Sequence, residues 1–269
     1  MKSYFIYVTI LILNFNAYPQ PNQKNDENHP TRNEKLFVGE DLTYVVKYAY
    51  FNLGEIRIKV LEKTKINSES VYKTIVSIDS YPDLPFVSLH QIYESYIDSS
   101  FFPLNFFAKI FSDDTVFVKY NFIGNSKIEM QKGKLGAKKL WLDSTAYTHH
   151  RMQDGLSILF YARMNFGHNK TLSVPCFVNE KEETTLLNFY NEAEPVSIEA
   201  VDYEINCLRL DGRTDFVSVY GLTGDFEGWF SNDNCSVPIR AKLNVLIGSV
   251  NLELIKWNKE VWNPPSYKN

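Results

Sequence analysis

The chain has 269 residues, of which 44% are hydrophobic and 15% aromatic, with 12 Gly and 11 Pro. This composition supplies enough apolar side chains for a buried core and excludes a disordered or collagen-like chain. Lys and Arg number 28 against 32 Asp and Glu, which gives a formal net charge of −4. The chain lacks the positive field that non-specific phosphate binding requires, so we expect no nucleic-acid partner.

Residues 1–20 have the pattern of a secretory signal peptide. Lys2 precedes an apolar run at residues 5–13, in which Thr9 is the one polar side chain. The run is shorter than the roughly 20 residues that span a bilayer, so we expect cleavage and no transmembrane anchor afterwards. Phe15 at the −3 position makes cleavage after Ala17 a poor small-x-small match, so cleavage after Gln20 competes with it. We expect a protein that is periplasmic or peripheral to the outer membrane.

The rest of the chain reads as a leader, one domain and a tail. Residues 21–35 contain no apolar side chain larger than proline, which predicts a flexible leader. Gly and Pro are dispersed singly from residue 36 to residue 262, which predicts a single β-rich domain. We assign residues 263–269 to a tail.

Period-two alternation dominates the domain. Ile56, Ile58 and Val60 alternate with charged residues, as expected of a strand with one solvated face. Similar segments recur around residues 117–120, 128–130, 201–207 and 250–254, separated by turn-forming pairs. The pattern predicts a mainly β fold with an antiparallel sheet.

Residues 154–166 break this pattern and predict one helix. Asp154 is a suitable N-cap and Gly167 a suitable C′ residue. Apolar side chains surround the helix almost completely: Leu156, Leu159, Phe160 and Met164 face one way, and Ile158, Tyr161 and Ala162 another. Such a helix should be covered on most sides. We therefore expect a curved antiparallel sheet, or half-open barrel, with one central helix in its concave side.

Residue patterns for catalysis or metal binding are weak. His149 and His150 are adjacent and fit neither HExxH nor HxH, and Ser157 lacks the GxSxG context of a nucleophile. We therefore predict no enzyme, no cofactor and no metal site. The odd number of cysteines leaves two states open, a bridge between Cys207 and Cys235 or three buried thiols.

A group of lysines near Trp141 allows two interpretations. The side chains of Lys132, Lys134, Lys138 and Lys139, together with Lys127, lie within one predicted hairpin. They are candidates for contacting anionic head groups, with Trp141 at the interface. Alternatively, the lysines protect a solvated sheet edge from aggregation.

Three motifs in order carry a family resemblance. They are GEDLTYVVKYAYFNLGEIRIKV at residues 39–60, DGLSILFYAR at 154–163, and WFSNDNCSVPIRAKLNVLIGSVNLEL at 229–254. In order and spacing, these motifs resemble the bacterial exported family named domain of unknown function 3108. The resemblance implies an exported curved sheet with a helix, similar in shape to lipoprotein carriers, and it implies no catalytic residue. Asn234, Cys235 and Ser236 replace a stretch that more often contains a basic residue, a departure within a turn.

The leading functional hypothesis is a non-enzymatic protein that holds a lipid, or the acyl chains of a lipoprotein, between sheet and helix. The candidates for lining this cavity are Tyr48, Phe51, Trp141, Leu156, Phe160, Met164 and Trp229. An envelope protein-interaction module without a cavity is the alternative. An envelope hydrolase is a third hypothesis, for which Asp154 and His150 would be tested first.

Overall fold

The computed structural model describes residues 35–82, 84, 88–216, 223–244 and 248–268. Among these residues, fourteen strands form one antiparallel sheet, accompanied by one α-helix. The predicted signal peptide, and all of the predicted leader except Lys35, lie outside the described residues.

The first half of the chain is a meander of eight strands, each hydrogen-bonded to the next. These strands are β1 (Asp41–Tyr48), β2 (Phe51–Ile66), β3 (Glu69–Ser80), β4 (His90–Asp98), β5 (Pro103–Ile110), β6 (Val116–Ile123), β7 (Lys127–Lys134) and β8 (Leu142–Tyr147). Hairpin connections of this kind place consecutive strands side by side.

The helix α1 (Ser157–Met164) separates this meander from a second one of six strands. The second meander comprises β9 (Lys170–Val178), β10 (Lys181–Val196), β11 (Ile205–Thr214), β12 (Gly224–Ser231), β13 (Pro238–Asn244) and β14 (Ser249–Lys256). The first and last strands then join the two halves, because β1 pairs with β14 and places Tyr44 opposite Leu254. The edges of the sheet are β8 and β9, and the sheet does not close on itself.

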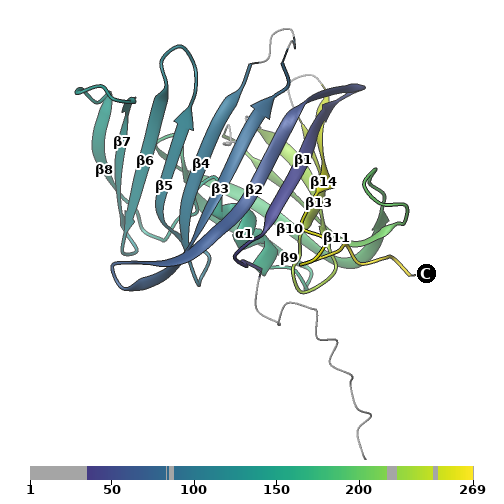
Figure 1. Cartoon of the computed structure of the whole chain (residues 1–269). Helices are drawn as coiled ribbons and strands as arrows, with labels where there is room; N and C mark the ends of the chain where they lie inside the picture. Colours follow the sequence, from purple (N-terminus) through teal and green to yellow (C-terminus); the bar gives the residue numbers. More distant parts are fainter. Residues whose placement is uncertain (1–34, 83, 85–87, 217–222, 245–247, 269) are drawn as a thin grey trace, which may run out of the picture.

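The sheet curves strongly, so that the second meander folds behind the first and α1 lies between them (Figure 1). The turn between β9 and β10 reaches the concave side of the first meander. Phe177 on β9 packs edge-on against Tyr120 on β6, with ring centroids 5.2 Å apart. Lys132 on β7 lies 3.1 Å from the Glu180 carboxylate in that turn. The predicted curved antiparallel sheet with one central helix is confirmed.

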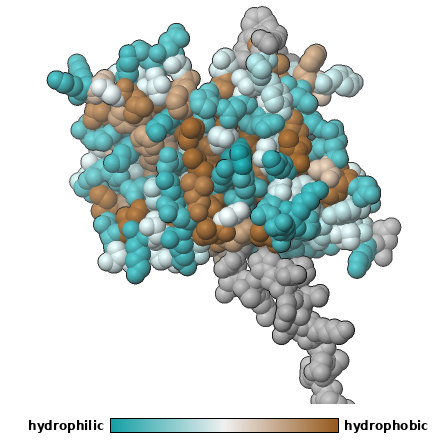
Figure 2. All heavy atoms as spheres, in the orientation of Figure 1, coloured by the Kyte–Doolittle hydropathy of each residue, from teal (hydrophilic) through white to brown (hydrophobic). Residues whose placement is uncertain are grey.

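Alternation along the strands sorts side chains between the two faces of the sheet. Ile56 and Ile58 are buried and lie opposite Ile78 and Val76 of β3. The space-filling view shows the outer face, where hydrophilic side chains flank bands of hydrophobic ones (Figure 2). Burial of one face is what fixes the register of each strand, since a shift by one residue would expose its apolar set.

The helix begins three residues after the predicted start. The Asp154 carboxylate caps it by accepting hydrogen bonds from the backbone N–H groups of Leu156 at 2.7 Å and Ser157 at 2.6 Å. The helix ends at Met164, and Gly167 follows with a φ of 112°. An isolated helix of eight residues is unstable in water, so packing inside the sheet must hold it.

The segment assigned to a tail packs against the start of β11. The N–H of Asn206 donates to the carbonyl of Pro265 at 2.8 Å, and that of Tyr267 donates to the carbonyl of Glu204 at 2.7 Å. Ser266 forms a bridge with Ile205. The folded unit therefore extends to residue 268.

Candidate functional site

A cavity of about 200 Å³ lies between α1 and the concave face of the sheet. Three helix residues, Ile158, Leu159 and Ala162, form one wall. Inward-facing side chains from β1, β2 and β9–β14 form the other: Tyr44, Ile56, Ile58, Cys176, Val178, Thr185, Leu187, Leu210, Phe226, Phe230, Ala241, Leu243 and Leu252. Ile158 and Leu159 remain partly exposed, so solvent reaches the cavity.

Small residues at the centre of the second meander leave this space unfilled. Leu210, Gly228, Ala241 and Leu252 lie in register across β11 to β14, and all four line the cavity. The two central residues of this row, Gly228 and Ala241, are its smallest. Ala162 on the helix is small as well. The hollow therefore follows from residue sizes at aligned positions.

The lining is almost entirely apolar. Asp225, Glu227 and Arg240 border the cavity, but they alternate with inward-facing Phe226, Gly228 and Ala241, so their side chains belong to the outer face. Asp154 is 1% exposed and lies at the helix end of the lining. Burial raises the pKa of Asp154, while its hydrogen bonds to Ser157 and Ser95 oppose this shift.

None of the seven predicted cavity residues lines this cavity. Leu156 and Phe160 are fully buried, but they face the main core cluster on the other side of α1. Met164 is 45% exposed beyond that core. The cavity is instead lined by the helix face that carries Ile158 and Ala162. Both faces are apolar, so the helix sequence alone did not distinguish them.

The other four candidates lie on strand ends or on the outer surface. Phe51 and Trp141 are 66% and 60% exposed, and Tyr48 ends β1. Trp229 follows Gly228, so alternation turns it outward, where its Nε1 donates to the Glu194 carboxylate at 2.7 Å. The Arg240 guanidinium lies 6.0 Å from the Trp229 ring centroid on the same outer face.

Two of the four candidate head-group lysines form ion pairs within the protein. Lys132 pairs with Glu180, as described above, and Lys134 pairs with Asp114. Lys138 and Lys139 are exposed in the connection between β7 and β8. None of these four lysines lines the cavity. Lys132 and Lys134 also have different acidic partners.

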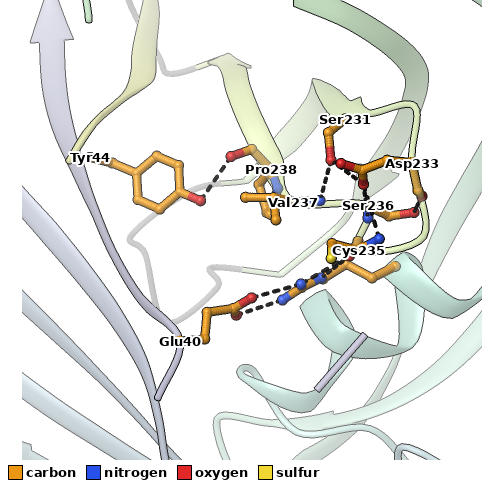
Figure 3. Close-up of polar contacts among 9 residues, drawn as sticks. Glu40, Tyr44, Ser231, Asp233, Cys235, Ser236, Val237 and Pro238 are labelled. Carbon is orange, nitrogen blue, oxygen red and sulfur yellow. Dashed lines mark hydrogen bonds and ion pairs between the residues drawn. The ribbon is translucent and has the colours of Figure 1, made fainter. Parts of the chain in front are cut away.

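A buried ion pair anchors the C-terminal end of α1. The Arg163 guanidinium, fully buried, donates two hydrogen bonds to the Glu40 carboxylate at 2.7 and 2.8 Å. It also donates to the carbonyl oxygen of Cys235 at 2.9 Å. Figure 3 shows Glu40 on one side of this contact and the turn with Asp233, Cys235 and Ser236 on the other. Burial lowers the pKa of Arg163, but the Glu40 carboxylate outweighs it, so the net shift is upward.

Lys35 and Asp233 extend this anchor. The Lys35 ammonium donates to the carbonyl oxygen of Arg163 at 2.6 Å and to the Ser236 hydroxyl at 3.0 Å. One Asp233 oxygen accepts from the N–H groups of Cys235 and Ser236, and the other accepts from the indole N–H of Trp262. Residues from all three motifs singled out in the sequence therefore meet at one end of the helix. Sequence reasoning missed this network, although Arg163 was the one charged residue in an apolar helix.

The described residues contain no cluster of three or more His, Cys, Asp or Glu side chains that would suit a metal ion. Cys176, Cys207 and Cys235 are free and buried. Burial raises the pKa of the Cys176 thiol to about 12 and that of Cys235 to about 11. In the described part of the chain, no helix combines the length and the hydropathy needed to cross a bilayer.

The fold and cavity define a β-barrel-like protein in which an unclosed antiparallel sheet surrounds one helix. Residues 43–255 match the model of the family described as "Protein of unknown function (DUF3108)", and the chain belongs to this family, which confirms the resemblance. Arg163 and Asp233 lie within the matched range, and Glu40 just precedes it.

A solved structure of similar fold is titled a beta-barrel-like protein of domain of unknown function DUF1849 from Brucella abortus. The TM-score is 0.51 at 11% sequence identity, and the match covers 83% of this chain and 97% of the other. At this identity the likeness concerns the fold alone. No curated protein matches the chain.

Proposed function

We propose that the protein is a non-enzymatic binder that holds one end of an apolar chain, such as the acyl chain of a lipid or lipoprotein, in the cavity beside α1. The observation that carries this proposal is the apolar, solvent-reached cavity lined by aligned small residues. An empty apolar space costs dispersion energy, and a well-matched apolar ligand restores it.

The size of the cavity limits what can enter. An apolar cavity of about 150 Å³ accommodates benzene, with its six carbon atoms. By proportion, a cavity of about 200 Å³ holds about eight carbon atoms. This volume suits the end of one chain and excludes a whole phospholipid. The remainder of a longer ligand would lie outside the cavity.

A chain-length series tests this proposal. We expect the affinity for primary alcohols to rise about fourfold for each added methylene, from about 0.8 kcal/mol per buried CH₂. The rise should stop near eight carbons, where the cavity is full. Isothermal titration calorimetry measures both the slope and the plateau. No binding of any alcohol would refute the proposal and favour an interaction module without a ligand.

Filling the cavity provides the matched variant. Ala241→Phe should place a ring into the space opposite Gly228 and abolish binding of the alcohols. Ala162→Leu should do the same from the helix wall. Ala137→Phe, at an exposed position between β7 and β8, is the control and should bind as the wild type does. Circular dichroism verifies that each variant is folded.

We further propose export through residues 1–20, to the periplasm or the periphery of the outer membrane. The apolar run that follows Lys2 supports this proposal. Native mass spectrometry of protein isolated from a Gram-negative envelope tests both proposals, export and binding of an apolar ligand. It gives the N-terminus of the mature chain and the mass of any bound molecule, which organic extraction then identifies. A chain that keeps residues 1–20 and remains in the cytoplasm would contradict export.

A further inference from the structure

One wall of the cavity, where β9, β10 and the N-terminal end of α1 meet, carries Thr185, Cys176 and Asp154. Thr185 on β10 is 1% exposed and lines the cavity. Its hydroxyl contacts one hydrogen-bonding atom, the Cys176 sulfur, at 3.6 Å. A hydroxyl offers one donor and two acceptor positions, and a thiol is a weak partner for either. Most of the hydrogen-bonding capacity of Thr185 is therefore unused inside an apolar space.

Cys176 adds a second neutral group to this wall. Its thiol is 1% exposed and points to the carbonyl oxygen of Val174 at 3.4 Å and to the Thr185 hydroxyl. Burial, opposed in part by Thr185 and reinforced by the Asp154 carboxylate, raises the pKa of Cys176 to about 12. The thiol therefore stays protonated, and the pair offers neutral hydrogen-bonding groups to a ligand.

Asp154 supplies the one buried carboxyl of this wall, and its oxygens already have partners. One accepts from the Ser95 hydroxyl at 2.6 Å, and the other accepts from the N–H groups of Leu156 and Ser157. No arginine or lysine side chain in the described lining faces inward, since Arg240 lies over Trp229 on the outer face. A ligand carboxylate at this wall would be buried in an apolar space without a compensating cation, which costs free energy.

We infer that the cavity selects an alkyl or acyl chain that carries an uncharged oxygen group, such as a hydroxyl, which pairs with Thr185. Because no cation of the described lining faces inward, the cavity excludes chains that end in a carboxylate. A buried hydroxyl without a strong partner costs free energy, and a ligand oxygen removes that cost. This inference rests on the proposed function and names the chemical class of its ligand.

Three probes of equal chain length test the inference: heptane, 1-heptanol and heptanoate. Thr185→Val removes the hydroxyl at nearly constant volume. We expect this change to weaken 1-heptanol binding about fivefold, the usual value of one hydrogen bond, and to leave heptane binding unchanged. Thr185→Ser, which retains the hydroxyl, should keep the wild-type preference for 1-heptanol over heptane. Thr145→Val, at an exposed position of β8, is the matched control and should change neither affinity.

Heptanoate tests the exclusion of anions. We expect it to bind the wild type at least tenfold more weakly than 1-heptanol does at pH 7, because no cation of the described lining faces inward to compensate its charge. If Thr185→Val weakens heptane and 1-heptanol equally, or heptanoate binds as tightly as 1-heptanol, the inference is overturned and the proposed function stands. If none of the three probes binds the wild type, the proposed function itself fails.

Discussion

The two faces of α1 are equally apolar and do different things. Leu156 and Phe160 are completely buried against the main core, whereas Ile158 and Leu159 stay partly exposed beside the cavity. The difference arises in the sheet opposite each face, because Gly228 and Ala241 leave space where other strands present large side chains. Hydrophobicity of a helix face therefore does not reveal whether it is core or ligand site. The size of the residues that it faces decides.

A second contrast lies along the helix axis. Its C-terminal end is held by the bidentate contact between Arg163 and Glu40, while its middle borders empty space. The ion pair fixes the helix by hydrogen bonds of defined geometry. It therefore fixes the C-terminal end of α1 relative to Glu40 and to the turn at Cys235.

The largest expected effect comes from breaking this anchor. Glu40→Ala leaves the Arg163 guanidinium buried without its anion, which should lower the free energy of unfolding by about 3–5 kcal/mol. Urea denaturation measures the loss. Arg57→Met is the control, because it removes a more exposed ion pair with Asp41, the residue next to Glu40. It should lower the free energy of unfolding by less than about 1 kcal/mol. Equal losses in the two variants would show that the buried pair does not anchor the helix.

Truncations on the two helix faces sharpen the first contrast. Phe160→Ala should lower the free energy of unfolding by about 3–5 kcal/mol, because it creates a void in packed core. Ile158→Ala should cost less than about 2 kcal/mol, since part of its surface already contacts solvent. For binding of 1-heptanol the order should reverse, with Ile158→Ala the more damaging change. Denaturation and calorimetry on both variants check this, and the same order in both measurements would contradict the assignment of the faces.

Local patterns predicted the architecture well because they report local physics. The alternation from Glu55 to Val60 predicted both the strand and its solvated face. Asp154 and Gly167 bracketed the helix to within three residues. The family motifs added the order of these elements. All of these signals depend on neighbours in the chain.

The site required information from distant residues. Alternation separates Trp229 from Gly228, but it does not say which of the two faces the cavity. Glu40 and Arg163 are 123 positions apart, and the curvature of the sheet around α1 brings them together. Lys35 was assigned to the leader because its neighbours are polar. Its role depends on the helix carbonyl that it meets in the fold.

The smallest expected effect concerns this lysine and the pH dependence of the anchor. Burial, reinforced by the Arg163 charge, lowers the pKa of Lys35 from 10.5 to about 8 in the folded protein. Between these values the unfolded chain keeps a proton that the folded chain has lost, so rising pH favours folding. Wild type should gain stability relative to Lys35→Met from about pH 8 to pH 10, with a constant difference below pH 8. The gain should stay below about 1 kcal/mol, since water screens this partly exposed group. Urea denaturation of both proteins at intervals of one pH unit measures it, and Lys138→Met controls for the loss of one exposed charge. A flat or falling difference above pH 8 would mean that Lys35 is not desolvated at the helix end.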